Sequence, residues 1–207
     1  MNFWVTVSNL GDVASMTPVT AGVAILLMYR RAWRLAIWWL ALFMLSSFLV
    51  LASKAAFIGW GIGHQGLDFT GLSGHATRAM AIFPVIGYLM AKNYPENAHF
   101  KRYIPLILFT LLGTIISVSR YLLLFHSLSE IITGWLFGAS LSGCFIFLLR
   151  RYQPLSISAE MRLIALIPLF FITNIEPTPT QLWIVNFSLY LSGHEQPMTG
   201  STGAYLP

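Results

Sequence analysis

The stretch from Ser119 to Glu130 places a histidine, His126, four residues before an acid, Glu130, at the start of an apolar run. Residues four apart share one face of a helix, so the Glu130 carboxylate can accept the Nδ1–H of His126. That hydrogen bond would fix the tautomer and leave Nε2 as a nucleophilic nitrogen. The pair also fits a capped helix start with an interfacial His–Glu hydrogen bond. Arg120 lies between apolar runs, where a charged group is costly unless it faces a polar cavity, so we expect it to bind an anion.

A second candidate site is the tripeptide Ser73-Gly74-His75. A turn of small residues at a helix N-terminus presents backbone N–H groups and the positive end of the helix dipole, which suits an anion. A histidine there can donate a proton to a leaving oxygen. Arg78 follows one helical turn later and is expected on the same face. The same tripeptide recurs as Ser192-Gly193-His194, for which we expect no function.

The composition indicates whether these residues lie in a soluble protein or in a membrane protein. The chain is 57% hydrophobic and 9% charged, whereas a soluble domain has roughly 45–50% and about 25%. This predicts an all-α polytopic membrane protein, and 207 residues leave room for about six spans of roughly 20 residues in one bundle. A single domain over residues 1–207 follows. The net charge of +5 is assigned to membrane orientation and not to nucleic-acid binding.

Six apolar runs are expected to form the spans, of which the last is short. They are Val13–Tyr29, Leu35–Ser53, Ala76–Ala91, Tyr103–Val118, Ser127–Leu149 and Met161–Thr173. Residues 174–207 are predicted to form a C-terminal extension on the outer side, with the apolar stretch Leu182–Leu191 in the membrane interface.

The positive-inside rule predicts the orientation. Nine of the twelve Lys and Arg residues fall in alternate connections between the runs, which makes that side cytoplasmic and places both termini outside a bacterial-type inner membrane. The three exceptions, Lys54, Arg78 and Arg120, converge on the outer face. An anion at that face is the simplest common partner, so we expect the site to face the periplasm or exterior.

The spacing of these motifs resembles that of the type 2 phosphatidic acid phosphatase superfamily, which includes the vanadium haloperoxidases. Ser119-Arg120, five residues, His126, three residues and an acid resembles its third signature, and Ser73-Gly74-His75 matches the core of its second. Lys54 is placed as the lysine that opens the first. The resemblance covers roughly residues 54–130.

The chain departs from the family pattern in three places. Gly61-Ile62 stand where the first signature continues to Arg-Pro, Leu72 replaces the proline before the second, and Glu130 replaces an aspartate. The missing arginine matters most, because glycine cannot replace a planar cation that binds phosphate bidentately. We hypothesise that Arg78 supplies this charge.

The resemblance implies a mechanism. His126 attacks phosphorus to form a phosphohistidine, Glu130 orients His126, and His75 protonates the leaving oxygen and then activates water. No metal or cofactor is implied, since the cations are side chains. The residues implied to bind the phosphate are Lys54, Ser73, Gly74, Ser119 and Arg120, to which our hypothesis adds Arg78.

The predicted function is therefore a membrane lipid phosphatase. Its substrate would be a lipid phosphate such as a polyprenyl diphosphate, phosphatidate, phosphatidylglycerophosphate or lipid A, among membrane lipids. Alternatives are a lipid phosphotransferase with the same site, a non-catalytic protein that binds anionic lipid, and a metal site. The metal site would use His64, Asp68, His75, His126 and Glu130, although three cations nearby would repel a metal ion. The oligomeric state is left open.

Overall fold

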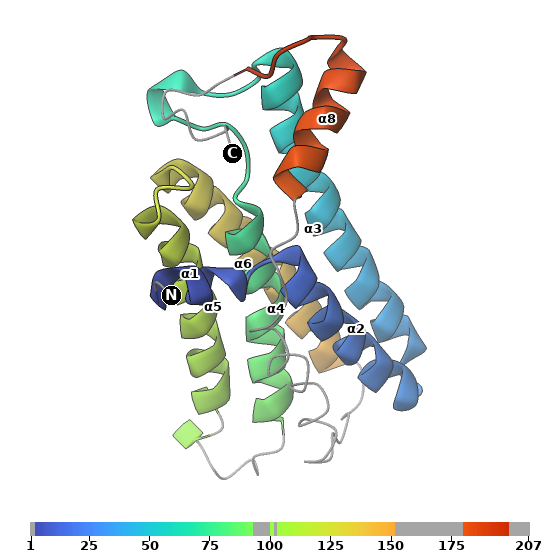
Figure 1. The fold of residues 1–207 in the computed structure, drawn as a ribbon. Coiled ribbons are helices and arrows are strands. Elements are labelled where there is room, and N and C mark those ends of the chain that lie inside the picture. The colour runs from blue at the N-terminus through green and yellow to red at the C-terminus, as the bar shows by residue number, and fades with distance from the viewer. Residues whose placement is uncertain (1–2, 93–99, 102, 152–179, 199–207) are drawn as a thin grey trace.

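The computed structural model describes residues 3–92, 100–101, 103–151 and 180–198. Within these ranges the chain is helical, with one isolated β-bridge between His64 and Phe69 and no strand. This confirms the all-α class for the described residues (Figure 1). The helices are α1 (Phe3–Asn9), α2 (Val13–Tyr29), α3 (Trp33–Trp60), α4 (Gly74–Ala91), α5 (Ile104–Leu122), α6 (Leu128–Arg151) and α8 (Thr180–Ser192), with a 3₁₀ turn at Gln65–Leu67.

Helix α4 lies at the centre of the bundle, where it packs against α5 and α6 and is buried along nearly its whole length (Figure 1). Phe83 of α4 is fully buried and belongs to a core that also contains Met16 of α2 and Phe145 of α6. The ring of Phe145 lies 5.0 Å from that of Trp39 of α3, centroid to centroid. The residues of the candidate site are therefore carried by a central helix and the helices around it.

Two glycines of α6 allow it to approach α4 closely. Gly134 and Gly138 form a small-xxx-small pattern, which lets helix backbones meet in a membrane. A Cβ on Gly138 would overlap the carbonyl oxygen of Thr77, and one on Gly134 would lie 2.8 Å from that of Ser73. This contact brings the first turn of α6 against the start of α4, where the Ser73 N–H donates to the Glu130 carbonyl oxygen at 3.2 Å.

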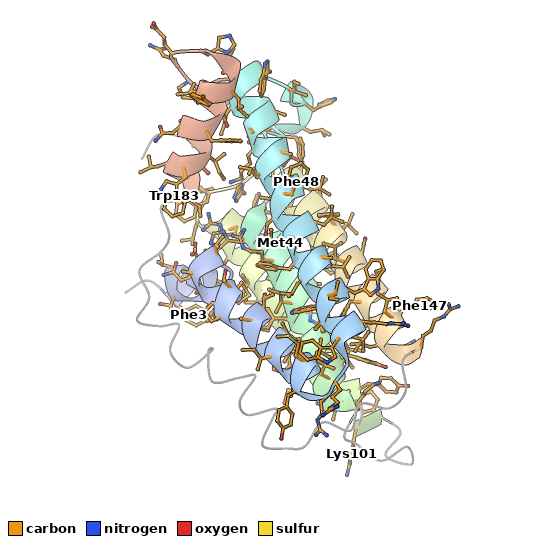
Figure 2. The ribbon with its side chains drawn as sticks, turned by 90° about the vertical axis from the view of Figure 1, so that its right-hand side faces the viewer. Phe3, Met44, Phe48, Lys101, Phe147 and Trp183 are labelled. Atoms are coloured by element: carbon orange, nitrogen blue, oxygen red, sulfur yellow. The ribbon has the colours of Figure 1, made fainter. Side chains whose placement is uncertain are left out.

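Three described helices, α3, α5 and α6, are long and apolar enough to cross a membrane. The pair α1 and α2, bent by 44°, adds a fourth if it is one broken span. Exposed apolar side chains such as Met44 and Phe48 of α3 and Phe147 of α6 project from the bundle (Figure 2). These features support membrane association. They do not establish six spans, because α4 falls outside this set and the predicted run Met161–Thr173 lies outside the described residues.

The basic helix ends gather at one end of the bundle, as their spacing predicted. Lys92 at the end of α4 donates from Nζ to the Leu149 carbonyl oxygen of α6 at 3.3 Å. Both Lys92 and Arg150 lie 5.7 Å from the ring centroid of Tyr88. Which side of the membrane this end faces stays a prediction.

Candidate active site

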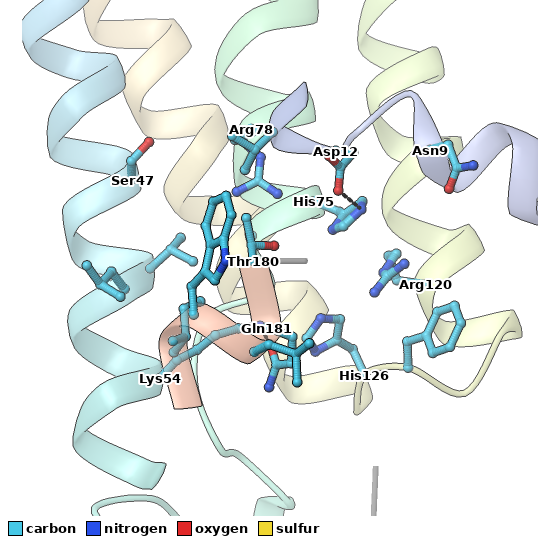
Figure 3. Close-up of a pocket in the computed structure, with 18 of the residues that line it drawn as sticks. Asn9, Asp12, Ser47, Lys54, His75, Arg78, Arg120, His126, Thr180 and Gln181 are labelled. Atoms are coloured by element: carbon cyan, nitrogen blue, oxygen red, sulfur yellow. Dashed lines mark hydrogen bonds and ion pairs between the residues drawn. The ribbon is translucent and has the colours of Figure 1, made fainter. Parts of the chain in front are cut away.

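A cavity of about 690 Å³ lies between α1, the start of α2, α3, α4, α5, the α5–α6 loop and α8 (Figure 3). One part of its wall is polar, and the other part is apolar and comes largely from α3 and α8. Six of the nine residues predicted to form the site line this cavity. They are Lys54, Gly74, His75, Arg78, Arg120 and His126.

The predicted contact between His126 and Glu130 is present. His126 Nδ1 lies 2.7 Å from Glu130 Oε2. The buried carboxylate also accepts hydrogen bonds from the Thr70 N–H at 2.8 Å and from the Thr70 hydroxyl. An ionised carboxylate only accepts, so His126 donates from Nδ1 and its Nε2 keeps the lone pair.

The turn before α6 explains how this pair is held. Leu124 has a φ of 58°, which reverses the chain after α5 so that His126 returns to the cavity. Ser127 and Glu130 form a capping box: the Ser127 N–H donates to Glu130 Oε2 at 3.3 Å and the Glu130 N–H donates to Ser127 Oγ at 3.3 Å. The capped helix start and the oriented histidine are therefore two properties of one carboxylate.

The surroundings of His126 favour its neutral form. Burial, together with the nearby charges of Lys54 and Arg120, lowers the pKa of His126 to about 4, although the hydrogen bond to Glu130 acts in the opposite direction. The imidazole is thus neutral above about pH 4, which is the form that can act as a nucleophile.

The start of α4 contributes His75 and Arg78. Arg78 is buried, and its Nε donates to the Gly11 carbonyl oxygen at 3.2 Å. A Cβ on Gly74 would lie 2.9 Å from Arg78 Nη1, so the guanidinium rests against the first residue of α4. The arginine that we expected to replace the missing one of the first signature therefore lies in the cavity wall.

Two further cations reach the cavity from α3 and α5. Lys54 Nζ donates to Gln181 Oε1 of α8 at 3.2 Å. Arg120 Nη1 donates to Ser8 Oγ at 2.8 Å, and its Cζ lies 4.4 Å from the ring centroid of Phe125. The cavity is thus bordered by three positive charges from three helices (Figure 3).

Two predicted phosphate-binding serines do not line the cavity. Ser119 is fully buried, and its hydroxyl donates to the Ile116 carbonyl oxygen at 2.6 Å. Ser73 precedes α4 and is also fully buried; its Oγ has no hydrogen-bond partner among the described residues. A role for either serine in binding phosphate stays a prediction.

The residues of the alternative metal site are not gathered. His64 and Asp68 lie in the α3–α4 loop and do not line the cavity. Among the described residues, no three His, Cys, Asp or Glu side chains lie together as a metal site would require.

The second Ser-Gly-His tripeptide lies at the end of α8. There His194 Nδ1 lies 2.7 Å from the Gly59 carbonyl oxygen and joins α8 to α3.

Sequence reasoning missed the contribution of the N-terminal segment. In this segment Ser8 contacts Arg120, and Gly11 contacts Arg78. Asp12 lies beside His75, with 3.7 Å between Asp12 Oδ2 and His75 Nε2. An aspartate directly before an apolar run is a helix N-cap signal. Combined with the predicted orientation, that signal could have placed Asp12 on the same face as the cations.

Two other neighbours of the site, Thr70 and Gln181, carried no such signal. Thr70 lies in the glycine-rich α3–α4 loop, and Gln181 follows a long tail whose path the sequence does not predict. Each contacts a site residue more than 50 positions away along the chain.

Comparison with known proteins identifies the family of the chain. A model of the PAP2 superfamily matches residues 60–154, which include both Ser73-Gly74-His75 and the stretch from Ser119 to Glu130. The chain is also 31% identical over 201 residues, 95% of each chain, to the "Uncharacterized 22.5 kDa protein in cps region" of Klebsiella pneumoniae. The chain belongs to the PAP2 superfamily. Membership supports a phosphatase-type activity in general terms. No solved structure matches the chain.

The fold explains why this PAP2 protein has no arginine at position 61. Gly61 ends α3 with a φ of 67°, a left-handed conformation that favours glycine. The Gly61 N–H donates to the Phe57 carbonyl oxygen at 2.7 Å and the Ile62 N–H to that of Ala56 at 3.2 Å, which closes the helix C-terminus. This conformation is less favourable for an arginine than for glycine. The arginines in the cavity wall, Arg78 and Arg120, come from α4 and α5 instead.

Proposed function

We propose that this PAP2 protein hydrolyses a phosphate monoester or diphosphate of a membrane lipid through a phosphohistidine on His126. One observation carries the proposal: a histidine oriented by a buried carboxylate lines the same cavity as three cations and a second histidine, and most of the remaining wall residues are apolar.

In this proposal the cations bind the phosphoryl group. Lys54, Arg78 and Arg120 approach from different helices, so together they can contact several oxygens and neutralise the charge that builds in the transition state. The backbone N–H of Gly74 adds the positive end of the α4 dipole. Side-chain cations thereby take the part that a metal ion takes in other phosphatases, and we expect activity in the presence of a chelator.

The first chemical step transfers the phosphoryl group to the protein. The Nε2 lone pair of His126 forms the N–P bond while the P–O bond to the lipid breaks. The electron pair of that bond leaves with the oxygen, which takes a proton from His75. Glu130 stabilises the positive charge that develops on His126.

The second step returns the protein to its starting state. His75, now neutral, removes a proton from water as the water oxygen attacks phosphorus. The N–P bond breaks and its electron pair returns to Nε2 of His126. Inorganic phosphate leaves, and both histidines have regained their original protonation states.

The apolar wall supports a lipid as substrate. Val50 and Leu51 of α3 face the same cavity as Leu182, Trp183 and Phe187 of α8. A phosphate held by the cations would have its alkyl or isoprenoid chain beside this wall. We therefore propose a polyprenyl diphosphate, phosphatidate, phosphatidylglycerophosphate or lipid A as substrate, at the outer side of a bacterial-type inner membrane.

The test is phosphate release from these four lipids in detergent with a chelator present. We expect wild-type protein to release phosphate from at least one lipid, and His126→Ala to lower the rate by about 10³-fold or more, as for other catalytic nucleophiles. His64→Ala is the matched control, since this exposed loop histidine lies outside the cavity wall and should leave the rate unchanged.

Equal rates in wild type and His126→Ala would overturn the mechanism. Comparison of the inorganic phosphate released with any phosphorylated lipid formed separates hydrolysis from transfer to a second lipid. Binding of these lipids without turnover would instead identify a non-catalytic lipid-binding protein.

A further inference from the structure

The break between α1 and α2 brings polar groups of the N-terminal segment onto the site. The two helices meet at 44°, and the residues around the break contact three site side chains from α4 and α5. Ser8 Oγ accepts from Arg120, and the Gly11 carbonyl oxygen accepts from Arg78. Asp12 faces His75 (Figure 3).

The close approach to His75 depends on the small size of residue 11. A Cβ on Gly11 would lie 2.8 Å from Ile116 Cγ2 and 3.2 Å from His75 Cβ. A larger residue would therefore push the segment away from the imidazole and carry Asp12 with it. Gly11 therefore allows both the break between α1 and α2 and the contact with His75.

Asp12 has a structural role that uses one of its oxygens. It is the N-cap of α2, and its Oδ1 accepts from the Ala14 N–H at 2.9 Å. The side chain is 7% exposed, and its other oxygen, Oδ2, lies 3.7 Å from His75 Nε2. Capping therefore does not explain why the second oxygen is directed at the histidine.

The charges around His75 suggest a role for the Asp12 carboxylate. From α3, α4, α5 and the α5–α6 loop, the groups that face His75 are Lys54, Arg78, Arg120 and His126. Three of these are cations, which oppose a proton on the imidazole. A buried carboxylate nearby acts in the opposite sense, and its effect is larger in a site of low dielectric constant than in water.

We propose that Asp12 is a positioning residue for the general acid: its carboxylate orients His75 and stabilises the imidazolium that protonates the leaving oxygen. This inference rests on the proposed function. A distance of 3.7 Å is too long for a hydrogen bond but suits an ion pair, so the N–H of His75 can still donate to the leaving oxygen. As the P–O bond breaks, its electron pair stays on the leaving oxygen, and this oxygen takes the proton from His75.

The test is Asp12→Asn, which keeps a capping oxygen for α2 and removes the charge. Two substrates should respond differently. An alkyl phosphate has a leaving group that needs a proton, whereas 4-nitrophenyl phosphate has one that departs without it. We expect kcat on the alkyl phosphate to fall by about 10² to 10⁴-fold, the usual contribution of general acid catalysis, with no rise in KM and little change for 4-nitrophenyl phosphate.

Asp68→Asn is the matched control. Asp68 lies in the α3–α4 loop outside the cavity wall and has a φ of 48°, which asparagine tolerates. Asp12→Ser is a second neutral variant that retains a capping oxygen. Helical circular dichroism and a single size-exclusion peak in detergent establish that each variant is folded.

Three outcomes would overturn the inference. Equal losses of kcat on both substrates would mean that Asp12 acts only through structure. Wild-type rates on both substrates, in a protein whose activity requires His126, would overturn the role of Asp12 and leave the proposed function intact. Absence of His126-dependent phosphate release from wild type would instead remove the proposed function, and the role of Asp12 with it.

Discussion

At the scale of single residues, the site depends on side chains that serve two structures at once. Glu130 closes the capping box of α6 and also holds Nδ1 of His126. Arg78 lies against Gly74 and also donates to the carbonyl oxygen of Gly11. Such shared contacts fix a side chain before substrate arrives, which lowers the cost of ordering it during binding.

Arg78 provides the prediction at this scale. If it replaces the arginine missing from position 61, Arg78→Ala should lower kcat/KM for phosphate release by about 10² to 10³-fold, the effect of removing one donor to transition-state charge. Arg78→Lys should recover only part of this, because lysine lacks the planar fork. Steady-state kinetics on the best lipid substrate measures both.

The control for Arg78 is Lys101→Ala, an exposed cation at the opposite end of the bundle (Figure 2). Full activity of Arg78→Ala, alongside inactive Lys54→Ala and Arg120→Ala, would show that Arg78 does not bind the phosphate.

At the scale of elements, the contact between α4 and α6 determines whether the two histidines share a cavity. His75 is carried by α4, and His126 lies two residues before α6. Gly134 and Gly138 bring the two backbones together. Between helices in lipid, close van der Waals packing replaces the hydrophobic effect as the source of stability. Loss of this close contact should therefore lower the free energy of unfolding.

A matched pair of glycine substitutions in α6 tests this contact. A Cβ at position 138 would overlap the Thr77 carbonyl oxygen, whereas one at Gly143 meets no atom within 4 Å. Gly138→Ala should lower the free energy of unfolding by about 1–3 kcal/mol and reduce activity. Gly143→Ala should be neutral or raise that free energy by up to about 1 kcal/mol, because alanine favours helix.

Unfolding in detergent, followed by circular dichroism, measures both changes. Equal stability of the two variants would contradict a tight contact between α4 and α6.

At the scale of the whole molecule, the cavity is assembled from parts distant in sequence. Asp12 of the N-terminal segment and Gln181 of α8 line the same cavity, with α3, α4 and α5 between them. The basic helix ends lie at the other end of the bundle. If the positive-inside rule holds, the α3–α4 loop should face the exterior and the α4–α5 connection the cytoplasm.

Cysteine accessibility tests this orientation. In a Cys144→Ala background, single cysteines at the exposed positions Leu67 and Lys101 report on the two ends. We expect a membrane-impermeant maleimide to label Leu67→Cys in intact cells, and Lys101→Cys only after the membrane is permeabilised. The reverse pattern would place the site on the cytoplasmic side.

Residue order alone predicted the features that depend on short-range geometry or on composition. The four-residue spacing of His126 and Glu130 predicted their contact, although His126 lies before α6 and reaches Glu130 through the turn that caps this helix rather than along a shared helix face. The apolar composition predicted the apolar helices that support membrane association. The spacing of Arg120, His126 and Glu130 with Ser73-Gly74-His75 was sufficient to identify the family, whose model matches the part of the chain that contains both motifs.

Only the tertiary structure decided the pairs that join separate elements. Asp12 with His75, Ser8 with Arg120 and Lys54 with Gln181 follow from helix packing and from a bend between α1 and α2. Helical periodicity predicts which face a residue occupies but not which helix will pack against it. The partners of His75, and with them the proposed support for its proton, therefore depend on how the chain packs in three dimensions.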